Sequence, residues 1–374
     1  MATEPHTRLD WLVLGPALAL TGLGLVMVYS TSSPLAFGRE GADGLSYLKR
    51  SLVFAAAGVP LALALSRVRA ELLRRLAYPA LGVAVLLLCL PWVPGLGQAV
   101  NGAHRWVRLG SIGFQPSEPA KFALVLFLAH SLAKRGAGVR SFANGYLPNV
   151  LIPGIPVGLV LLEPDLGTAA LMAAVVLAMA FLGGVRVRHL VAGLTPLLPL
   201  AVYLLWFVGF RRERILAFLD PWQHAQGAGF QLVQSLLAFG SGGLWGVGLG
   251  ASRQKLYYLP EAHTDFILSV WAEERGLVGV ALVLSLVLVL VGRGYWIAAR
   301  QEDPFRQLLA AGIATWIGAQ AAINALVVTG CVPTKGLSFP FLSYGGTGLV
   351  VALAAAGVLA GLGRQPVPDR EAPG

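Results

Sequence analysis

The sequence predicts an all-α, polytopic membrane protein, and its composition is the first reason. Of the 374 residues, 56% are hydrophobic and only 12% are charged, about half the charged share of an average soluble domain. The mean hydropathy is +0.71. Apolar runs near the length that a helix needs to cross a bilayer recur along the chain. This composition excludes a soluble globular domain and a disordered chain, and the runs are too long and continuous for a membrane β-barrel.

Ten transmembrane helices are expected from these apolar runs. They cover approximately residues 11–30, 51–66, 76–95, 118–133, 147–163, 167–184, 188–210, 265–292, 307–331 and 347–363. One membrane domain, residues 1–364, is expected to contain all ten helices and a long outer loop, 211–264, between the seventh and eighth. Residues 365–374 are expected to form a short cytoplasmic tail.

The basic residues predict the orientation of the chain. The net charge is +10, and most Lys and Arg residues of the short connectors fall on one side of the predicted membrane. Cytoplasmic loops carry such an excess, so both termini are expected in the cytoplasm. The chain is expected to lie in the plasma or inner membrane. The same rule explains the positive net charge, so this charge is no reason to expect nucleic-acid binding. The longer, chemically richer segments then face outward, and the active face is expected there.

Ionisable residues at the edges of the predicted helices are the first candidates for function, because a charge in the bilayer core is costly. Glu118 and Lys121 lie one turn apart at the start of the fourth helix. They form either a self-neutralising pair or the wall of a polar cavity that offers Lys121 to an anion. Asp165 follows Glu163 and Pro164 in a very short connector, where it can cap the next helix.

Asp265 stands where the eighth helix is expected to begin. Thr264 or Asp265 could serve as the N-cap of that helix. Alternatively, Glu273 and Glu274 in the same apolar run indicate a water-filled cavity. A carboxylate at the outer mouth of such a cavity could act as a general base.

Two outer segments add cations and broken backbone. Residues 332–346 contain prolines and glycines that forbid a continuous helix, which predicts either a re-entrant segment that carries Lys335 into a cavity or an ordinary outer loop. Residues 221–239 are expected to form an amphipathic helix at the interface, followed by a flexible glycine-rich loop, 240–250. Basic Arg253 and Lys255 come next, beside Tyr257 and Tyr258, and suit a lipid with an anionic head. These residues favour either an enzyme acting on a phospholipid-like substrate or a transporter of an amphipathic anion.

Four stretches of the sequence resemble the SEDS family (shape, elongation, division and sporulation) of membrane glycosyltransferases, which polymerise lipid II into peptidoglycan. They are Asn101-Gly-Ala-His-Arg105-Trp106 with Gln115-Pro-Ser-Glu118-Pro-Ala-Lys121, Glu163-Pro-Asp165-Leu-Gly-Thr-Ala, Tyr258-Leu-Pro-Glu261-Ala-His263-Thr-Asp265-Phe with Ala272-Glu273-Glu274, and Pro333 to Gly346. Within the family, the sequence is more similar to FtsW, the septal member, than to RodA, the elongation member. The alternatives are an elongation-type RodA polymerase, a sporulation homologue, a lipid II flippase or other transporter, and a scaffold for division proteins. Arg275 and Thr347-Gly348 depart from the usual family pattern.

The resemblance implies roles for individual residues. The family's essential aspartate falls on Asp265, which implies an inverting glycosyl transfer with Asp265 as the catalytic base. The implied substrate-binding residues are Arg105, Glu118, Lys121, Asp165, Arg253, Lys255, His263, Lys335 and Ser343. A divalent cation, Mg or Mn, is expected as a cofactor, with Asp165 or Glu118 as its ligand. The expected substrate is lipid II. The expected partners are the membrane, a class B penicillin-binding protein as transpeptidase, and other division or elongation proteins. No nucleic-acid partner is expected.

Overall fold

The structure, a computed structural model, describes residues 9–37, 45–100, 103–110, 112–195, 197–207, 209–256 and 259–364. The predicted tail, 365–374, as well as Tyr257 and Tyr258, lies outside the described residues. Thirteen α-helices dominate the part that is described, so the predicted all-α class is confirmed. The helices are α1 (Trp11–Phe37), α2 (Ser46–Leu65), α3 (Ala70–Cys89), α4 (Ser117–Arg135), α5 (Leu147–Leu162), α6 (Leu166–Leu182), α7 (Val187–Leu194), α8 (Leu197–Trp206), α9 (Gly209–Leu219), α10 (Phe230–Gly242), α11 (Ile267–Ala299), α12 (Pro304–Val328) and α13 (Gly346–Leu362). Short 3-10 or π turns lie at Leu90–Trp92, Gly136–Arg140 and Phe142–Tyr146.

Seven helical segments among the described residues are long and apolar enough to cross a membrane. They contain α1 to α5, α11 and α12, and the shorter α6 and α13 are also apolar. Nine of the ten predicted spans therefore coincide with a helix, although several edges shift by a few residues. The expected span 188–210 is wrong as a single helix, because α7 ends at Leu194 and α8 begins at Leu197. The sequence has a proline between them, and proline has no backbone N–H to continue a helix.

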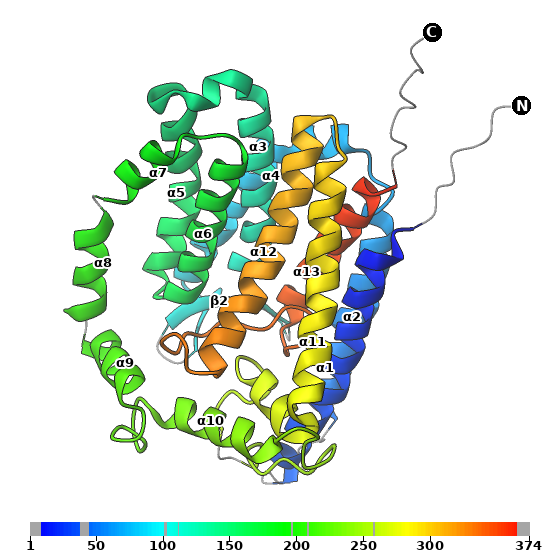
Figure 1. Cartoon of the computed structure of the whole chain (residues 1–374), viewed down its shortest axis with the longest axis vertical. Coiled ribbons are helices and arrows are strands. Elements are labelled where there is room, and N and C mark those ends of the chain that lie inside the picture. The colour runs from blue at the N-terminus through cyan, green and yellow to red at the C-terminus, as the bar shows by residue number, and fades with distance from the viewer. Residues whose placement is uncertain are drawn as a thin grey trace, which may run out of the picture.

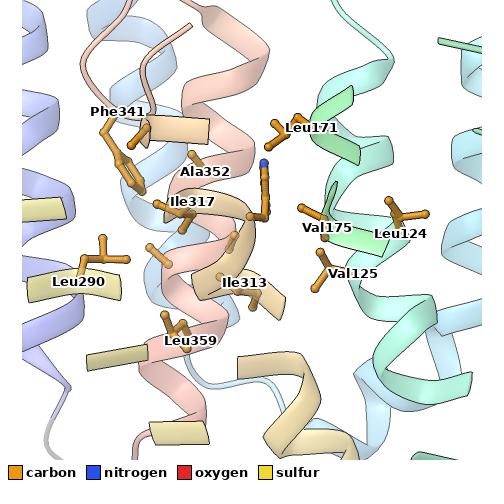
Figure 2. Close-up of a cluster of buried hydrophobic side chains, with 14 of the residues drawn as sticks. Leu124, Val125, Leu171, Val175, Leu290, Ile313, Ile317, Phe341, Ala352 and Leu359 are labelled. Carbon is orange, nitrogen blue, oxygen red and sulfur yellow. The ribbon is translucent and has the colours of Figure 1, made fainter. Parts of the chain in front are cut away.

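The bundle is packed around α12. This helix contacts α4, α6, α11 and α13, and its Ile313 and Ile317 lie among buried apolar side chains of those neighbours (Figure 2). In Figure 1, the start of α1 and the end of α13 lie at one end of the bundle, whereas α10 lies at the other. The helices α8 and α9 run along the outside and link the bundle to α10 (Figure 1).

Small residues allow a close helix contact between α2 and α13. A Cβ atom added to Gly357 would lie 2.2 Å from the carbonyl oxygen of Ala62, and one added to Gly361 would lie 2.6 Å from that of Ser66. Lipid chains are as apolar as leucine, so membrane helices associate largely through such close packing of small side chains. The glycines of the last apolar run therefore fix where α13 lies.

A small sheet precedes α4, and the sequence analysis did not predict it. The strands β1 (Gly97–Val100), β2 (Ala103–Leu109) and β3 (Ile112–Phe114) form an antiparallel sheet in the order β1-β2-β3. Gln98 faces Trp106 across the first pair, and Val107 faces Phe114 across the second. The strand β2 carries Arg105, so this sheet positions one of the predicted substrate-binding residues.

The segment between α12 and α13 has no regular helix from residue 331 to 345, as predicted for a re-entrant segment. Its Phe339, Phe341 and Leu342 are nevertheless buried. Gly24 of α1 permits this burial, because a Cβ there would lie 2.6 Å from the carbonyl oxygen of Leu342. Irregular backbone at membrane depth is tolerated where protein surrounds it, and α1 and α12 provide that environment.

Candidate functional site

Asp265 lies in a turn directly before α11 and does not cap that helix. The N-cap position is Phe266, and no side chain makes a capping hydrogen bond there. The hydroxyl of Thr264 instead donates to the Glu261 carboxylate at 2.8 Å. The capping interpretation of Thr264 or Asp265 is therefore wrong, because this helix begins without a side-chain cap.

The surroundings of Asp265 make it a suitable base near neutral pH. Its side chain is half-buried, and burial raises the pKa of its carboxyl group to about 7. The nearby carboxylates of Glu261 and Asp165 raise this pKa further, whereas the guanidinium groups of Arg105 and Arg214 lower it. Asp265 thus lies within electrostatic range of two acids and two cations, of which Asp165, Arg105 and Arg214 are distant from it in the sequence.

The re-entrant segment is bound to the turn that carries Asp265. The Ser343 hydroxyl donates to the carbonyl oxygen of Thr264 at 2.6 Å, and the Tyr344 amide donates to that of His263 at 2.9 Å. The His263 ring lies 5.2 Å from the ring of Tyr47 and 5.7 Å from that of Tyr344. Two predicted substrate-binding residues, Ser343 and His263, therefore contribute to holding this turn in place.

Asn324 of α12 connects the same two segments, and the sequence analysis did not select it. Its side-chain amide donates to the carbonyl oxygen of Asp265 at 2.8 Å and to that of Leu337 at 2.6 Å. One turn earlier, Gln320 donates to the carbonyl oxygen of Ser338 at 2.9 Å. Two amides one turn apart in an apolar helix were the signal that could have indicated this face of α12.

Arg105 joins the sheet to the connector between α5 and α6. Its guanidinium group donates to the carbonyl oxygen of Glu163 at 3.1 Å and also to that of Pro164. Asp165 caps α6 as predicted, since its carboxylate accepts from the Thr168 amide at 3.1 Å and the Thr168 hydroxyl at 2.9 Å.

The backbone at Lys335 and Gly336 lies close to Gly167 and Asp265. A Cβ added to Gly167 would lie 3.0 Å from the carbonyl oxygen of Gly336 and 3.5 Å from the Lys335 Cβ. A Cβ added to Gly336 would lie 3.0 Å from a carboxylate oxygen of Asp265. Burial lowers the pKa of the Lys335 amine, so an anionic ligand here would favour its charged form. Lys335, Asp165 and Asp265 therefore converge, although three different segments carry them.

Arg214 of α9 is a further cation of this site that the sequence analysis missed. Its guanidinium group donates to the carbonyl oxygen of Thr334 at 3.3 Å, next to Lys335. The predicted outer loop contains several arginines, and the sequence offers no spacing rule that singles out this one. Only the path of α9 past the re-entrant segment brings Arg214 to the site.

Glu163 is the buried acid of this region that has no hydrogen-bond partner. Its side chain is 1% exposed, and neither carboxylate oxygen has a partner. Burial raises the pKa of Glu163 to about 8, and the nearby Asp165 carboxylate adds to this rise. The Glu163 side chain is therefore mostly a neutral acid at pH 7.

Replacing Glu163 by Gln should stabilise the protein at pH 8 but not at pH 5. The pKa is about 8 in the folded state and near 4.5 when unfolded, so the wild type loses stability as the pH rises through that window. The neutral amide removes this loss, and we expect a gain of about 4 kcal/mol at pH 8. Thermal unfolding in detergent at both pH values measures it, with the exposed Glu302→Gln as control. A Gln variant less stable than wild type at pH 8 would contradict the expectation.

Other predicted substrate-binding residues lie in separate networks. The Lys121 ammonium contacts a Glu118 carboxylate oxygen at 2.9 Å and the Gln320 side-chain oxygen at 3.0 Å, and all three residues are buried. Lys255 forms a buried ion pair with Glu274 at 3.0 Å. These pairs give a structural reason for acids and cations in apolar helices, so Glu274 does not require the water-filled cavity that the sequence indicated. Arg253 is exposed, and its backbone amide donates to the Glu273 carboxylate at 3.0 Å.

The described residues do not build the predicted divalent-ion site. Asp165 directs its carboxylate at Thr168, and Glu118 directs its carboxylate at Lys121. Within the described ranges, no group of three or more His, Cys, Asp and Glu side chains could hold a metal ion. The cation stays a prediction from the resemblance.

The helical bundle and the segments that meet at Asp265 have counterparts in known proteins. The family described as a cell cycle protein, FtsW/RodA/SpoVE, matches residues 10–366. The chain belongs to the FtsW/RodA/SpoVE family. The multi-pass membrane location that the sequence predicts agrees with the membrane-length helices and with this membership.

Individual members of the FtsW/RodA/SpoVE family support the same assignment. The chain is 45% identical over 352 residues to a probable peptidoglycan glycosyltransferase FtsW of Geobacter sulfurreducens, with 94% of each protein covered. It is 42% identical to a protein of the same name from Coxiella burnetii, over 93% of this chain and 94% of that protein.

Solved structures of the family share the fold. A chain from a structure of a peptidoglycan synthase complex, on the coordination of polymerization and crosslinking, superposes with a TM-score of 0.78 at 35% identity, covering 96% of this chain and 98% of that chain. The rod shape determining protein RodA of Thermus thermophilus gives a TM-score of 0.69 at 32% identity, covering 96% and 97%.

Proposed function

We propose that this member of the FtsW/RodA/SpoVE family is a peptidoglycan glycosyltransferase that polymerises lipid II during cell division. The observation that carries the proposal is the half-buried Asp265 carboxyl group, whose pKa is raised to about 7, between the cations Arg105 and Arg214. The FtsW relatives are named probable peptidoglycan glycosyltransferases, and the resemblance of the sequence to FtsW implies lipid II as the substrate and the septal role.

The proposed reaction is an inverting glycosyl transfer. Asp265, in its ionised form, takes the proton from the C4 hydroxyl group of the acceptor's GlcNAc. The hydroxyl oxygen then forms a bond to C1 of the donor's MurNAc, and the bond from C1 to undecaprenyl pyrophosphate breaks. A base with a pKa close to the working pH is ionised in a useful fraction of molecules and still binds a proton strongly enough. The raised pKa of Asp265 meets this requirement.

The leaving pyrophosphate needs positive charge where its own charge develops. Arg105 and Arg214 are the cations around Asp265, and the backbone of Gly336, next to Lys335, lies beside the Asp265 carboxylate. We assign the pyrophosphate to Arg105, Arg214 and Lys335. Lys121 and Lys255 are held in ion pairs elsewhere. We further propose that the Asp265 end faces outward with both termini cytoplasmic, and that a class B penicillin-binding protein crosslinks the product.

The pH dependence should report Asp265 directly. Because the pKa of its carboxyl group is raised to about 7, the ionised base is lost as the pH falls through that value. We expect kcat/KM to rise between pH 6 and pH 8 with an apparent pKa near 7, approaching a tenfold change per pH unit on its acid side. Initial rates on lipid II across this range measure it, and a flat profile would contradict Asp265 as the base.

The test of the function itself uses lipid II in detergent. The purified protein, with its transpeptidase partner, is mixed with lipid II, and the products are separated by size. Glycan strands would support the polymerase, because detergent leaves no bilayer across which a flippase could act. The absence of polymer in detergent, together with lipid II translocation in vesicles, would overturn the proposal in favour of a transporter.

A further inference from the structure

The helix α11 is interrupted close to its start, and a loop fills the interruption. Gly276 has φ 64° and ψ −164°, which is not helical. Across this break, the amides of Val247 and Gly248 donate to the carbonyl oxygens of Glu273 and Glu274 at 2.9 and 3.1 Å. In an uninterrupted helix, the amides of residues four positions further on would make these bonds.

The exchange of hydrogen bonds is reciprocal. The amides of Leu277 and Val278, displaced by the break, donate to the carbonyl oxygens of Gly243 and Leu244 at 2.9 and 3.2 Å. Four backbone groups that a broken helix would leave unsatisfied are therefore paired with residues 243–248. Satisfying them is obligatory in a membrane protein, so this pairing holds the loop against α11.

Glycine is required for this approach. A Cβ added to Gly246 would lie 2.3 Å from the carbonyl oxygen of Glu274, and φ at Gly246 is 80°. A Cβ added to Gly242 would lie 2.0 Å from that of Ala272. The glycine-rich stretch, expected to be a flexible loop, is instead fixed to α11, because its glycines permit backbone contact.

Side chains secure the returning part of the loop. The Glu273 carboxylate accepts from the Ser252 hydroxyl and from the amides of Arg253 and Gln254, at 3.0 and 3.3 Å for the amides. Glu274 pairs with Lys255 and accepts from the Ser30 hydroxyl of α1 at 2.8 Å. Both ends of the loop are thus fixed to the bundle.

This fixed loop presents large apolar side chains outward. Leu244, Trp245, Val247 and Leu249 are all exposed, and Trp245 is 79% exposed. The apolar patch continues onto α11, where Leu277, Val278 and Leu282 are also exposed. Exposed apolar residues along a membrane-spanning helix face lipid, so the loop extends the lipid-facing surface.

The length of α11 places the loop at the edge of the bilayer. Two helical parts meet at the break, and the part after it, residues 277–299, is about 35 Å long, close to the hydrocarbon core of about 30 Å. Near its other end, the guanidinium groups of Arg293 and Arg300 lie 3.7 and 3.8 Å from the Trp296 ring centroid, a combination typical of the interface. The break at Gly276 lies about one hydrocarbon thickness before Trp296 along the helix. The loop at the break therefore lies at the opposite interface.

We propose that residues 243–249 form an interfacial anchor that inserts Leu244, Trp245, Val247 and Leu249 at the headgroup–acyl boundary of the leaflet on the Asp265 side. The exposed Arg275 beside the break can contact lipid phosphates there. The anchor fixes the depth of the first part of α11, and with it the depth of Asp265 in the membrane. A reaction on a lipid-linked sugar depends on that depth.

Depth-dependent fluorescence quenching tests the anchor without using activity. The full-length protein is placed in nanodiscs of phosphatidylglycerol and phosphatidylcholine brominated either near the headgroup end or near the methyl end of the acyl chain. The chain has nine tryptophans, so the contribution of Trp245 is taken as the difference between wild type and Trp245→Phe. Trp296→Phe is the matched control for a tryptophan at the other interface.

We expect the Trp245 contribution to be quenched at least twofold more by the shallow bromines than by the deep ones. Protection from aqueous iodide should accompany this. Quenching by iodide without quenching by either brominated lipid would overturn the anchor, because Trp245 would then lie in water. Protection from all three quenchers in the presence of a partner protein would also overturn it, in favour of a protein interface.

A second measurement links the anchor to the site and rests on the proposed function. Leu244→Ser combined with Trp245→Ser should lower polymerisation severalfold in nanodiscs and leave the rate in detergent unchanged. An equal loss in both media, or none in nanodiscs, would overturn the depth-setting role. If the wild type makes no polymer in either medium, the proposed function fails, whereas the quenching result still decides the anchor.

Discussion

Replacing Asp265 by Asn should lower the rate of glycan polymerisation by about 10²- to 10⁴-fold, the range typical for loss of a general base. The amide has nearly the same shape as the carboxyl group but cannot take the acceptor's proton. The fold should persist, because the raised pKa of Asp265 shows that its surroundings already disfavour the charged form. Turnover of lipid II in detergent measures the loss, and a thermal unfolding curve confirms folding.

Glu261 offers the matched control for this experiment. It is an exposed acid in the same turn, and its charge raises the pKa of Asp265. Glu261→Gln should therefore keep activity within a fewfold of wild type and move the acid limb of the pH profile to lower pH. Full activity of Asp265→Asn, or an equal loss in Glu261→Gln, would show that Asp265 is not the base.

Replacing Lys121 by Met should destabilise the protein by about 3–5 kcal/mol, because it removes one partner of a buried ion pair. The Glu118 carboxylate would lose its contact with the Lys121 ammonium at 2.9 Å and remain buried in the bundle. Thermal unfolding in detergent measures the change, and a fall in Tm on the order of 10 °C is expected for a chain of this size.

A double variant separates the ion pair from the packing of the side chains. Combining Lys121→Met with Glu118→Gln removes both charges and should recover most of the lost stability. Lys134→Met, at the exposed end of the same helix, should change stability by less than about 0.5 kcal/mol. If Glu118→Gln fails to restore stability, the ion pair is not what Lys121 contributes to the stability of the protein.

The network around Lys121 explains why the two interpretations of this residue were hard to separate. A lysine and a glutamate one turn apart fit a pair and an anion-binding wall equally well. The structure adds a partner from another helix, since the Gln320 side-chain oxygen accepts a second ammonium proton at 3.0 Å. Because α12 supplies Gln320, no spacing within the fourth predicted helix could have revealed it.

Spacing in the sequence also could not separate the cations predicted to bind substrate. Lys255 and Lys335 both lie in outer segments and look equivalent in the sequence. The structure pairs Lys255 with Glu274 and places Lys335 near Gly167, in the region of Asp165 and Asp265. Arg214 and Asn324 join the site although no motif includes them.

The sequence by itself determined the membrane class, the position of nine apolar helices, the re-entrant segment and the aspartate on which the proposed chemistry rests. These features are local, because helix length, apolar runs and helix-breaking residues act over one stretch of chain. Tertiary structure alone decided which charges meet, where the apolar run 188–210 breaks, and that a glycine-rich loop completes the interrupted helix α11. Ion pairs and backbone exchange depend on distances between segments far apart in the sequence, and only the packing of the helices sets those distances.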